Sequence, residues 1–203
     1  MKLTATVLFA DLKDFTALAE KTDPALVMEW LNEFTASMSA QILRHDGIIN
    51  EFTGDGLMAT FGIPIPRQTA EAVDDDARAA VASALAMGQE LTRLNQRWKA
   101  DGRPTTSMRV GVATGPVVTG SLGGTDRLKY AVVGDTVNAA ARLEAYDKEG
   151  RILGSPTLTC RILVGETTWT RLGDLFDGEL AGGFALKGKE QPINVYQVFG
   201  RKP

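Results

Sequence analysis

The sequence is poor in the residues that several common kinds of site require. Its single cysteine, Cys160, excludes an intramolecular disulfide, and its single histidine, His45, excludes a histidine-rich zinc site and argues against a Ser-His-Asp triad. No segment approaches the roughly 18 apolar residues of a membrane-spanning helix. Positive charge is not in excess, because 22 Lys and Arg stand against 25 Asp and Glu. The net charge of −3 therefore predicts no general attraction to nucleic acid or to an anionic membrane.

What is present fits one folded domain over residues 1–203. With 44% hydrophobic and 23% charged residues, the chain can bury a core and keep a solvated surface. There is no internal repeat, low-complexity tract or linker. The first ten residues resemble a strand rather than a signal peptide, so we expect a cytoplasmic location. A longer parent protein could still add a membrane anchor or an upstream regulatory domain.

Hydrophobic periodicity predicts the element order βαββαβ. Residues 3–10 form a buried strand, and a helix capped by Asp23 follows, with its apolar positions spaced by three and four residues. An Asp-Gly turn predicts a hairpin over 48–61. A second helix begins near Asp74–Asp76, where acidic residues suit the helix dipole, and a strand covers 108–113. This is the order of the split βαβ unit.

Three further segments extend this core. We expect a strand over 130–133, a helix from about Thr136, and a β-rich tail over 193–199. The predicted fold class is therefore α+β, a ferredoxin-like or palm βαββαβ core with a C-terminal αβ extension. Its central sheet should be mainly antiparallel and flanked by helices.

This topology brings together two aspartates that lie far apart in the sequence. In a split βαβ unit the third strand runs antiparallel beside the first, so Asp11 at the end of one strand should meet Asp55 at the start of the other. Two carboxylates there suit a pair of divalent cations about 3.5–4 Å apart, an arrangement for phosphoryl transfer. Capping and turn formation would explain either aspartate alone. A polymerase palm also fits, but the charge and the small size speak against it.

Five ordered segments resemble the class III nucleotidyl cyclase catalytic domain. They are VLFADLKDFT at 7–16, FTGDG at 52–56, MRVGV at 108–112 with Thr114-Gly115 after it, VGDTVNAAARLE at 133–144, and LKGK at 186–189. The resemblance spans nearly the whole chain. It implies that a nucleoside triphosphate is cyclised to a 3′,5′-cyclic monophosphate and pyrophosphate, by two-metal-assisted attack of the 3′-hydroxyl on the α-phosphate.

The resemblance also assigns roles to residues. Asp11 and Asp55 match the ligands of two cations, Mg²⁺ or Mn²⁺, and Leu12 matches a position that lends a backbone carbonyl. Asn138 and Arg142 match the transition-state pair, and their i, i+4 spacing puts both on one helix face. The phosphate-binding positions are occupied by basic residues, Arg109 and Lys187.

Members of this family form head-to-tail homodimers with active sites at the interface. The resemblance implies that one subunit brings Asp11, Asp55 and Arg109. The partner then brings the other set, which consists of Glu51, Ala131, Asn138, Arg142 and Lys187. Because one chain holds both sets, a homodimer with two complete sites is expected.

Glu51 and Ala131 match the two positions that read the purine. Guanine presents N1–H and N2 amino donors, from which the carboxylate of Glu51 can accept hydrogen bonds. Adenine N1 is itself an acceptor, so it would face the carboxylate without forming a hydrogen bond. The sequence therefore predicts a guanylate cyclase that uses GTP. Ala131 offers no hydrogen-bonding group to either base. An adenylate or mixed-specificity cyclase remains the alternative, and a non-catalytic dimerisation or nucleotide-sensing module is a further one.

Overall fold

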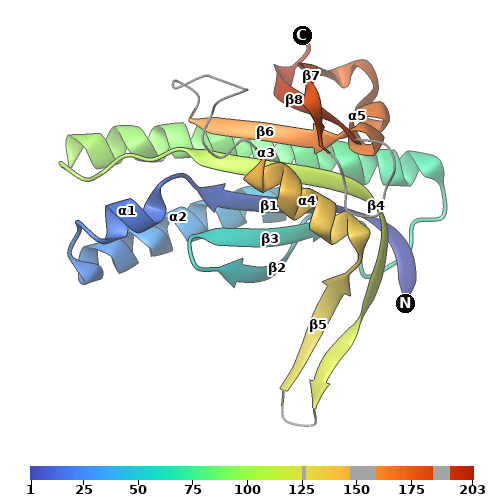
Figure 1. Ribbon diagram of the computed structural model, residues 1–203, viewed down its shortest axis with the longest axis horizontal. Helices are drawn as coiled ribbons and strands as arrows, with labels where there is room; N and C mark the ends of the chain where they lie inside the picture. The colour runs from blue at the N-terminus through green and yellow to red at the C-terminus, as the bar shows by residue number, and fades with distance from the viewer. Residues whose placement is uncertain (125–126, 147–158, 185–192) are drawn as a thin grey trace.

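The computed structural model describes residues 1–124, 127–146, 159–184 and 193–203, and these contain one eight-stranded sheet. Its strand order is β2-β3-β1-β4-β6-β8-β7, and β5 pairs with β4 beside this path (Figure 1). β4 and β6 run parallel, whereas the other neighbouring strands run antiparallel. The strands are β1 Lys2–Leu12, β2 Ile48–Thr53, β3 Gly56–Phe61, β4 Met108–Gly124, β5 Arg127–Val133, β6 Cys160–Gly165, β7 Phe176–Phe184 and β8 Ile193–Arg201.

Helices cover both faces of this sheet. The long helices α2 (Pro24–Arg44) and α3 (Ala70–Ala100) pack against one face, and α4 (Asp135–Ala145) lies on the other (Figure 1). The shorter helices are α1 (Phe15–Ala19), α5 (Glu166–Leu172) and the 3₁₀ turn η1 (Gly173–Leu175). None of the helices among the described residues is long and apolar enough to cross a membrane. The expected α+β class, with a mainly antiparallel sheet between helices, is confirmed.

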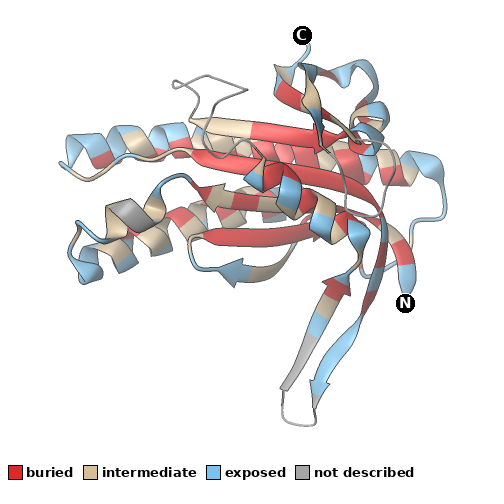
Figure 2. Ribbon diagram, in the orientation of Figure 1, coloured by how far each residue is buried: buried red, intermediate tan, exposed pale blue. Residues whose placement is uncertain are grey.

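β1 is buried on both faces, and its side chains alternate between two cores. Leu8, Ala10 and Leu12 join the core beneath α2 and α3, whereas Leu3 and Val7 join the core beneath α4. Successive side chains of a strand point to opposite faces. Asp11 therefore shares the α4 face with Val7. Figure 2 shows the central strands as the most buried part of the molecule.

The second long helix begins earlier than the sequence predicts. Thr69, not the run of aspartates, caps α3, and its Oγ1 accepts a hydrogen bond from the backbone N–H of Ala72 at 3.2 Å. The three aspartates lie in the next turn, where they form ion pairs instead: Asp74 with Arg171, Asp75 with Arg78 and Asp76 with Arg67. Asp74 and Asp76 therefore pair with arginines outside α3, whereas Asp75 pairs with Arg78 one turn further along the same helix.

β4 is much longer than the predicted strand over 108–113. It pairs with β1 as far as Val118 and then continues to Gly124 with β5 as its partner. The two strands form a ribbon that projects from the body of the molecule (Figure 1). Large apolar side chains are exposed along this β4–β5 arm at Val118, Leu122, Tyr130 and Val133.

Candidate active site

Strand register brings Asp11 beside Asp55, as the topology predicts. Asp11 on β1 lies opposite Gly56 on β3, and Asp55 occupies the turn directly before Gly56. A Cβ added at Gly56 would lie 3.2 Å from Oδ1 of Asp11 and 2.9 Å from the carbonyl oxygen of Ala10. The missing side chain at Gly56 therefore leaves the space in which the Asp11 carboxylate approaches the turn.

The two carboxylates influence one another electrostatically. Burial raises the pKa of Asp55 above its ordinary value, and the negative charge of Asp11 raises it further. The positive charge of Arg109 acts in the opposite direction, with a smaller effect on this pKa. The pair is therefore held in a negative environment that a bound cation would stabilise.

The chemistry of this corner fits a hard divalent cation. Asp11 and Asp55 supply carboxylate oxygens. Leu12 is the last residue of β1 and its side chain is buried, so its backbone carbonyl is the group that it could offer to a cation. Among the described residues there is no group of three or more His, Cys, Asp and Glu side chains arranged for a metal. Mg²⁺ is commonly held by one or two carboxylates, with waters and substrate phosphates as its other ligands. A two-carboxylate site is therefore sufficient for it.

Arg109 is buried between two carboxylates. Its Nη2 donates to Oδ2 of Asp11 at 2.7 Å, and its Nε donates to Oε1 of Glu144 at 2.9 Å. Arg109 is 8% exposed and Glu144 is 9% exposed. The guanidinium thus joins the aspartate pair to helix α4.

Glu144 closes the 133–144 segment, but the resemblance assigns it no role. The buried positions of α4 are Thr136, Ala140, Leu143 and Glu144, at i, i+4, i+7 and i+8. A glutamate within an otherwise buried helical stripe needs a partner, because a buried charge is costly unless it is paired. That position in the stripe is the signal by which sequence reasoning could have found it.

Asn138 and Arg142 lie on the outer surface of α4. Both side chains are exposed, whereas Ala140 and Leu143 between and beyond them are buried against the sheet. The expected helix over this segment and the common face of the two residues are confirmed. Both are therefore accessible to a molecule that approaches α4 from outside.

The two residues matched to purine recognition lie on strands that contact one another. Glu51 is half-buried on β2 opposite Met58, just after a register shift between Ile49 and Glu51. Ala131 is half-buried on β5 opposite Gly120. β5 contacts β2. Lys187, the second expected phosphate-binding residue, lies outside the described residues.

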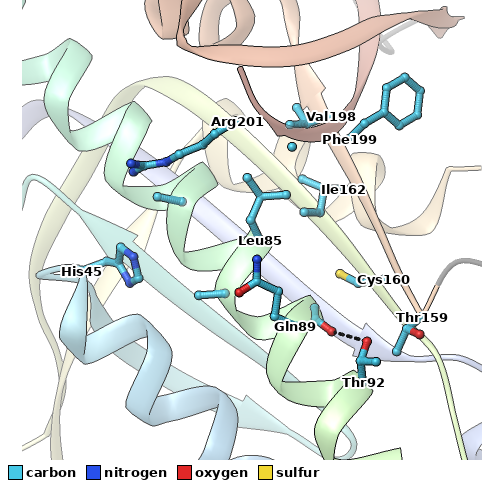
Figure 3. A pocket seen from close by; sticks show the side chains of 14 residues that line it. His45, Leu85, Gln89, Thr92, Thr159, Cys160, Ile162, Val198, Phe199 and Arg201 are labelled. Atoms are coloured by element: carbon cyan, nitrogen blue, oxygen red, sulfur yellow. Dashed lines mark hydrogen bonds between the residues drawn. The ribbon is translucent and has the colours of Figure 1, made fainter. Parts of the chain in front are cut away.

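A large pocket lies elsewhere. It has a volume of about 640 Å³ and is lined by α3, β6 and β8 together with His45 (Figure 3). None of the predicted site residues in the described part of the chain lines it. Burial raises the pKa of Cys160 in its wall to about 12, so the thiol stays protonated and is a poor nucleophile at neutral pH. No Asp or Glu is among the residues that line this pocket, so it offers no carboxylate to a divalent cation.

The sequence profile of the adenylate and guanylate cyclase catalytic domain matches residues 2–200. The chain belongs to this cyclase family. Adenylate cyclase 1 of Rhizobium meliloti is 32% identical over 96% of the chain, and the chain spans 27% of that protein's length. The crystal structure of the adenylyl cyclase CyaB from P. aeruginosa superposes with a TM-score of 0.86 at 31% identity, covering 100% of this chain and 96% of that one.

A guanylyl cyclase is equally similar to this cyclase domain. The crystal structure of the guanylyl cyclase Cya2 superposes with a TM-score of 0.84 at 33% identity, covering 100% of this chain and 94% of that one. Similarity of the whole fold therefore does not separate the two purines. The resemblance noted in the sequence is confirmed at the level of the family, and base preference depends on individual side chains.

Proposed function

We propose that this cyclase domain converts GTP to 3′,5′-cyclic GMP and pyrophosphate. The observation that carries the proposal is the juxtaposition of Asp11 and Asp55 beside a buried arginine, in a chain that also presents Asn138 and Arg142 on an exposed helix face. The first group suits a polyphosphate with divalent cations, and the second suits contacts to the ribose and the α-phosphate.

Asp11, Asp55 and the carbonyl of Leu12 would hold two cations, Mg²⁺ or Mn²⁺. When bound, these ions lower the pKa of the ribose 3′-hydroxyl and offset the negative charge of the phosphates. The protein's part is to fix the carboxylates, and the space at Gly56 and the pairing of Asp11 with Arg109 do this. Arg109 and Lys187 would carry positive charge toward the phosphate chain.

Asn138 and Arg142 would act on the nucleotide from α4. The Asn138 amide would orient the ribose through its ring oxygen, and the Arg142 guanidinium would stabilise charge that builds on the α-phosphate. Both roles require side chains that are free to meet a ligand outside their own subunit. The exposure of both residues is consistent with that requirement.

The proposed assembly is a head-to-tail homodimer with two interfacial active sites. One subunit would supply Asp11, Asp55 and Arg109, and its partner would supply Glu51, Ala131, Asn138, Arg142 and Lys187. The exposed apolar side chains of the β4–β5 arm support a second copy as the partner. A two-stranded ribbon is marginally stable alone in water, and contact with another subunit would bury this apolar surface.

Glu51 supports GTP over ATP. A carboxylate accepts hydrogen bonds from guanine N1–H and N2–H, whereas adenine N1 presents a lone pair to it. The 32% identical relative from Rhizobium meliloti is an adenylate cyclase by name, so ATP is the second candidate substrate. Ala131 has no side-chain acceptor for the adenine N6 amine.

Purified protein incubated with GTP or ATP, each with Mg²⁺ or Mn²⁺, tests the proposal through chromatography of the products. Glu51→Lys should shift the ratio of kcat/KM for GTP over ATP toward ATP, because it replaces an acceptor for guanine with a donor for adenine N1. Loss of a charge-assisted contact costs about 1.5–3 kcal/mol, or roughly 10- to 150-fold in GTP efficiency. Ala131→Asp added to Glu51→Lys should favour ATP further.

Glu179→Gln on the exposed surface of β7 is a matched control for loss of a carboxylate and should leave the ratio unchanged. An unchanged ratio in folded Glu51→Lys would remove the support for GTP. Cyclic AMP as the main wild-type product would establish the adenylate alternative. Absence of turnover with both nucleotides and both metals would favour a non-catalytic module.

A further inference from the structure

Two arginines on neighbouring strands hold the C-terminal end of α4. Arg109 on β4 and Arg161 on β6 are partners in the parallel register, so they lie side by side on the sheet. Arg109 donates to the Glu144 carboxylate, and Arg161 Nη2 donates to the backbone carbonyls of Glu144, at 3.0 Å, and of Tyr146. Cations at this end also suit the negative pole of the helix. The end of α4 is thereby fixed to the sheet in side chain and backbone.

Gly111 brings the helix backbone directly onto the strand. A Cβ built at Gly111 would lie 2.2 Å from the backbone nitrogen of Glu144 and 2.3 Å from the carbonyl oxygen of Ala140. Gly111 follows Arg109 by two residues and therefore shares its face of β4. The Arg109–Glu144 ion pair and this close contact thus lie at the same place on the sheet, with little freedom for α4 to shift.

The same guanidinium reaches the aspartate pair. Asp11 on β1 is the register partner of Arg109, which is in turn the partner of Arg161. A continuous series of contacts therefore runs from Asp11 through Arg109 to Glu144 at the end of α4. Glu144 lies two residues after Arg142, on the buried side of the helix that presents Asn138 and Arg142.

We propose that Glu144 is a positioning residue that fixes the metal-binding half and the α4 half of one subunit relative to each other. The inference rests on the proposed function. In a head-to-tail dimer these two halves serve different active sites, so each Glu144 acts on both sites of the dimer. It does so by sharing the charge of Arg109 with Asp11 and by holding the end of α4 on the sheet.

Glu144→Gln tests the charge directly. The amide oxygen can still accept from Arg109 Nε, but Asp11 then faces a guanidinium whose charge is no longer shared. The cation site becomes less negative, so Mn²⁺ should bind about 10-fold more weakly, the scale of loss when a group supporting a metal ligand is changed. The loss of the free Mn²⁺ signal in electron paramagnetic resonance measures this without nucleotide or turnover.

Glu144→Asp separates charge from shape. The shorter carboxylate keeps the charge and disturbs packing more than glutamine does, so it should recover most of the Mn²⁺ affinity. A purely structural role would make aspartate worse than glutamine. Unchanged Mn²⁺ affinity in Glu144→Gln, or a larger loss in Glu144→Asp, would overturn the proposal, whatever the activity. Glu179→Gln serves again as the control with an exposed carboxylate.

Heterodimers test the action on both sites. Mixing an Asp55→Ala chain with an Asn138→Ala chain leaves one complete site per mixed dimer. That site takes its metal half from the Asn138→Ala chain and its α4 half from the Asp55→Ala chain. With random exchange half the dimers are mixed, so activity should approach roughly a quarter of wild type. No recovery despite demonstrated exchange would refute the interfacial assignment in the proposed function, not the role of Glu144, which the Mn²⁺ measurement then decides.

Glu144→Gln is then placed in either chain. In the Asn138→Ala chain it should raise the Mn²⁺ concentration for half-maximal rate about 10-fold. In the Asp55→Ala chain it should lower kcat about 10-fold with unchanged Mn²⁺ dependence, because only the α4 half of the working site is affected. An effect from one placement only would overturn the proposed action on both sites.

Discussion

Replacing Gly111 with alanine should lift α4 from the sheet. The new Cβ would lie 2.2 Å from the nitrogen of Glu144 and 2.3 Å from the oxygen of Ala140, whereas ordinary contact begins near 3.4 Å. The helix must therefore recede by about 1.1–1.2 Å. Both opposing atoms belong to the backbone, so no side-chain rotation relieves the overlap. The displacement also stretches the 2.9 Å hydrogen bond between Arg109 and Glu144.

The expected magnitude follows from this displacement. Overpacking in a close-packed interior costs about 1–3 kcal/mol, and a rigid contact between two backbones puts Gly111→Ala at the upper end, about 3 kcal/mol. A misplacement of about 1 Å in a catalytic constellation can lower the rate about 100-fold. Since α4 carries Asn138 and Arg142, the loss should appear in kcat even where the protein is fully folded.

Urea denaturation and steady-state kinetics on the folded fraction measure these two effects. Gly200→Ala on β8 is a matched control, because a Cβ there meets nothing within 4 Å and the residue also lies in a strand. It should change neither stability nor kcat appreciably. Retention of kcat within about threefold in Gly111→Ala, with stability near wild type, would show that the close contact does not position α4.

Two further expectations concern the aspartate pair and a distant ion pair. Asp11→Ala or Asp55→Ala should abolish turnover while the protein stays folded, and retention of more than about a tenth of the rate would contradict two-metal catalysis. Asp76, 7% exposed, accepts hydrogen bonds from Arg67 at 2.7 and 2.8 Å, so Asp76→Asn should lower the free energy of unfolding by about 2 kcal/mol without changing the GTP to ATP ratio. Urea denaturation measures the loss, and an unchanged midpoint would refute it.

The meeting of Asp11 and Asp55 was predictable because it depends on topology alone. In a βαββαβ unit the first and third strands are antiparallel neighbours, so the register follows once the hairpin turn is located. The common face of Asn138 and Arg142 was predictable for a similar reason, since it needs only the helical period. Their roles in binding metal and nucleotide remain predictions.

The β4–β5 arm was not predictable from local pattern. Its strands contain Gly120, Gly123 and Gly124, and glycine normally marks a turn or a weakened strand. Beyond Val118 the two strands of the arm pair with no third strand among the described residues. Neither face of the arm therefore shows the regular alternation of apolar and polar residues that marks a half-buried strand. The sequence therefore predicted only 108–113 and 130–133 as strands. The additional residues of β4 and β5 are strands because the two segments pair with each other, and this pairing cannot be inferred from either segment alone.

The environment of Arg109 was also beyond local reasoning. Its two partners lie 98 and 35 residues away, and only the packed fold brings them within hydrogen-bond distance. An arginine on a strand, taken alone, reads as surface or as a phosphate ligand. In the folded protein it is almost fully buried, so its charge must first be satisfied inside the chain.

Charge balance links this arginine to the proposed chemistry. The charged groups at the corner are the acids Asp11, Asp55 and Glu144 and the bases Arg109 and Arg161, which are register partners. With all five ionised, three negative charges against two positive charges leave −1, which one divalent cation would more than offset. Burial and, after it, the negative charge of Asp11 raise the pKa of Asp55, and protonation of Asp55 would reduce the excess of negative charge. These side chains do not carry enough negative charge for two divalent cations, so we expect the remaining positive charge to be balanced by the triphosphate itself, and the two-metal site to be completed only when the nucleotide binds.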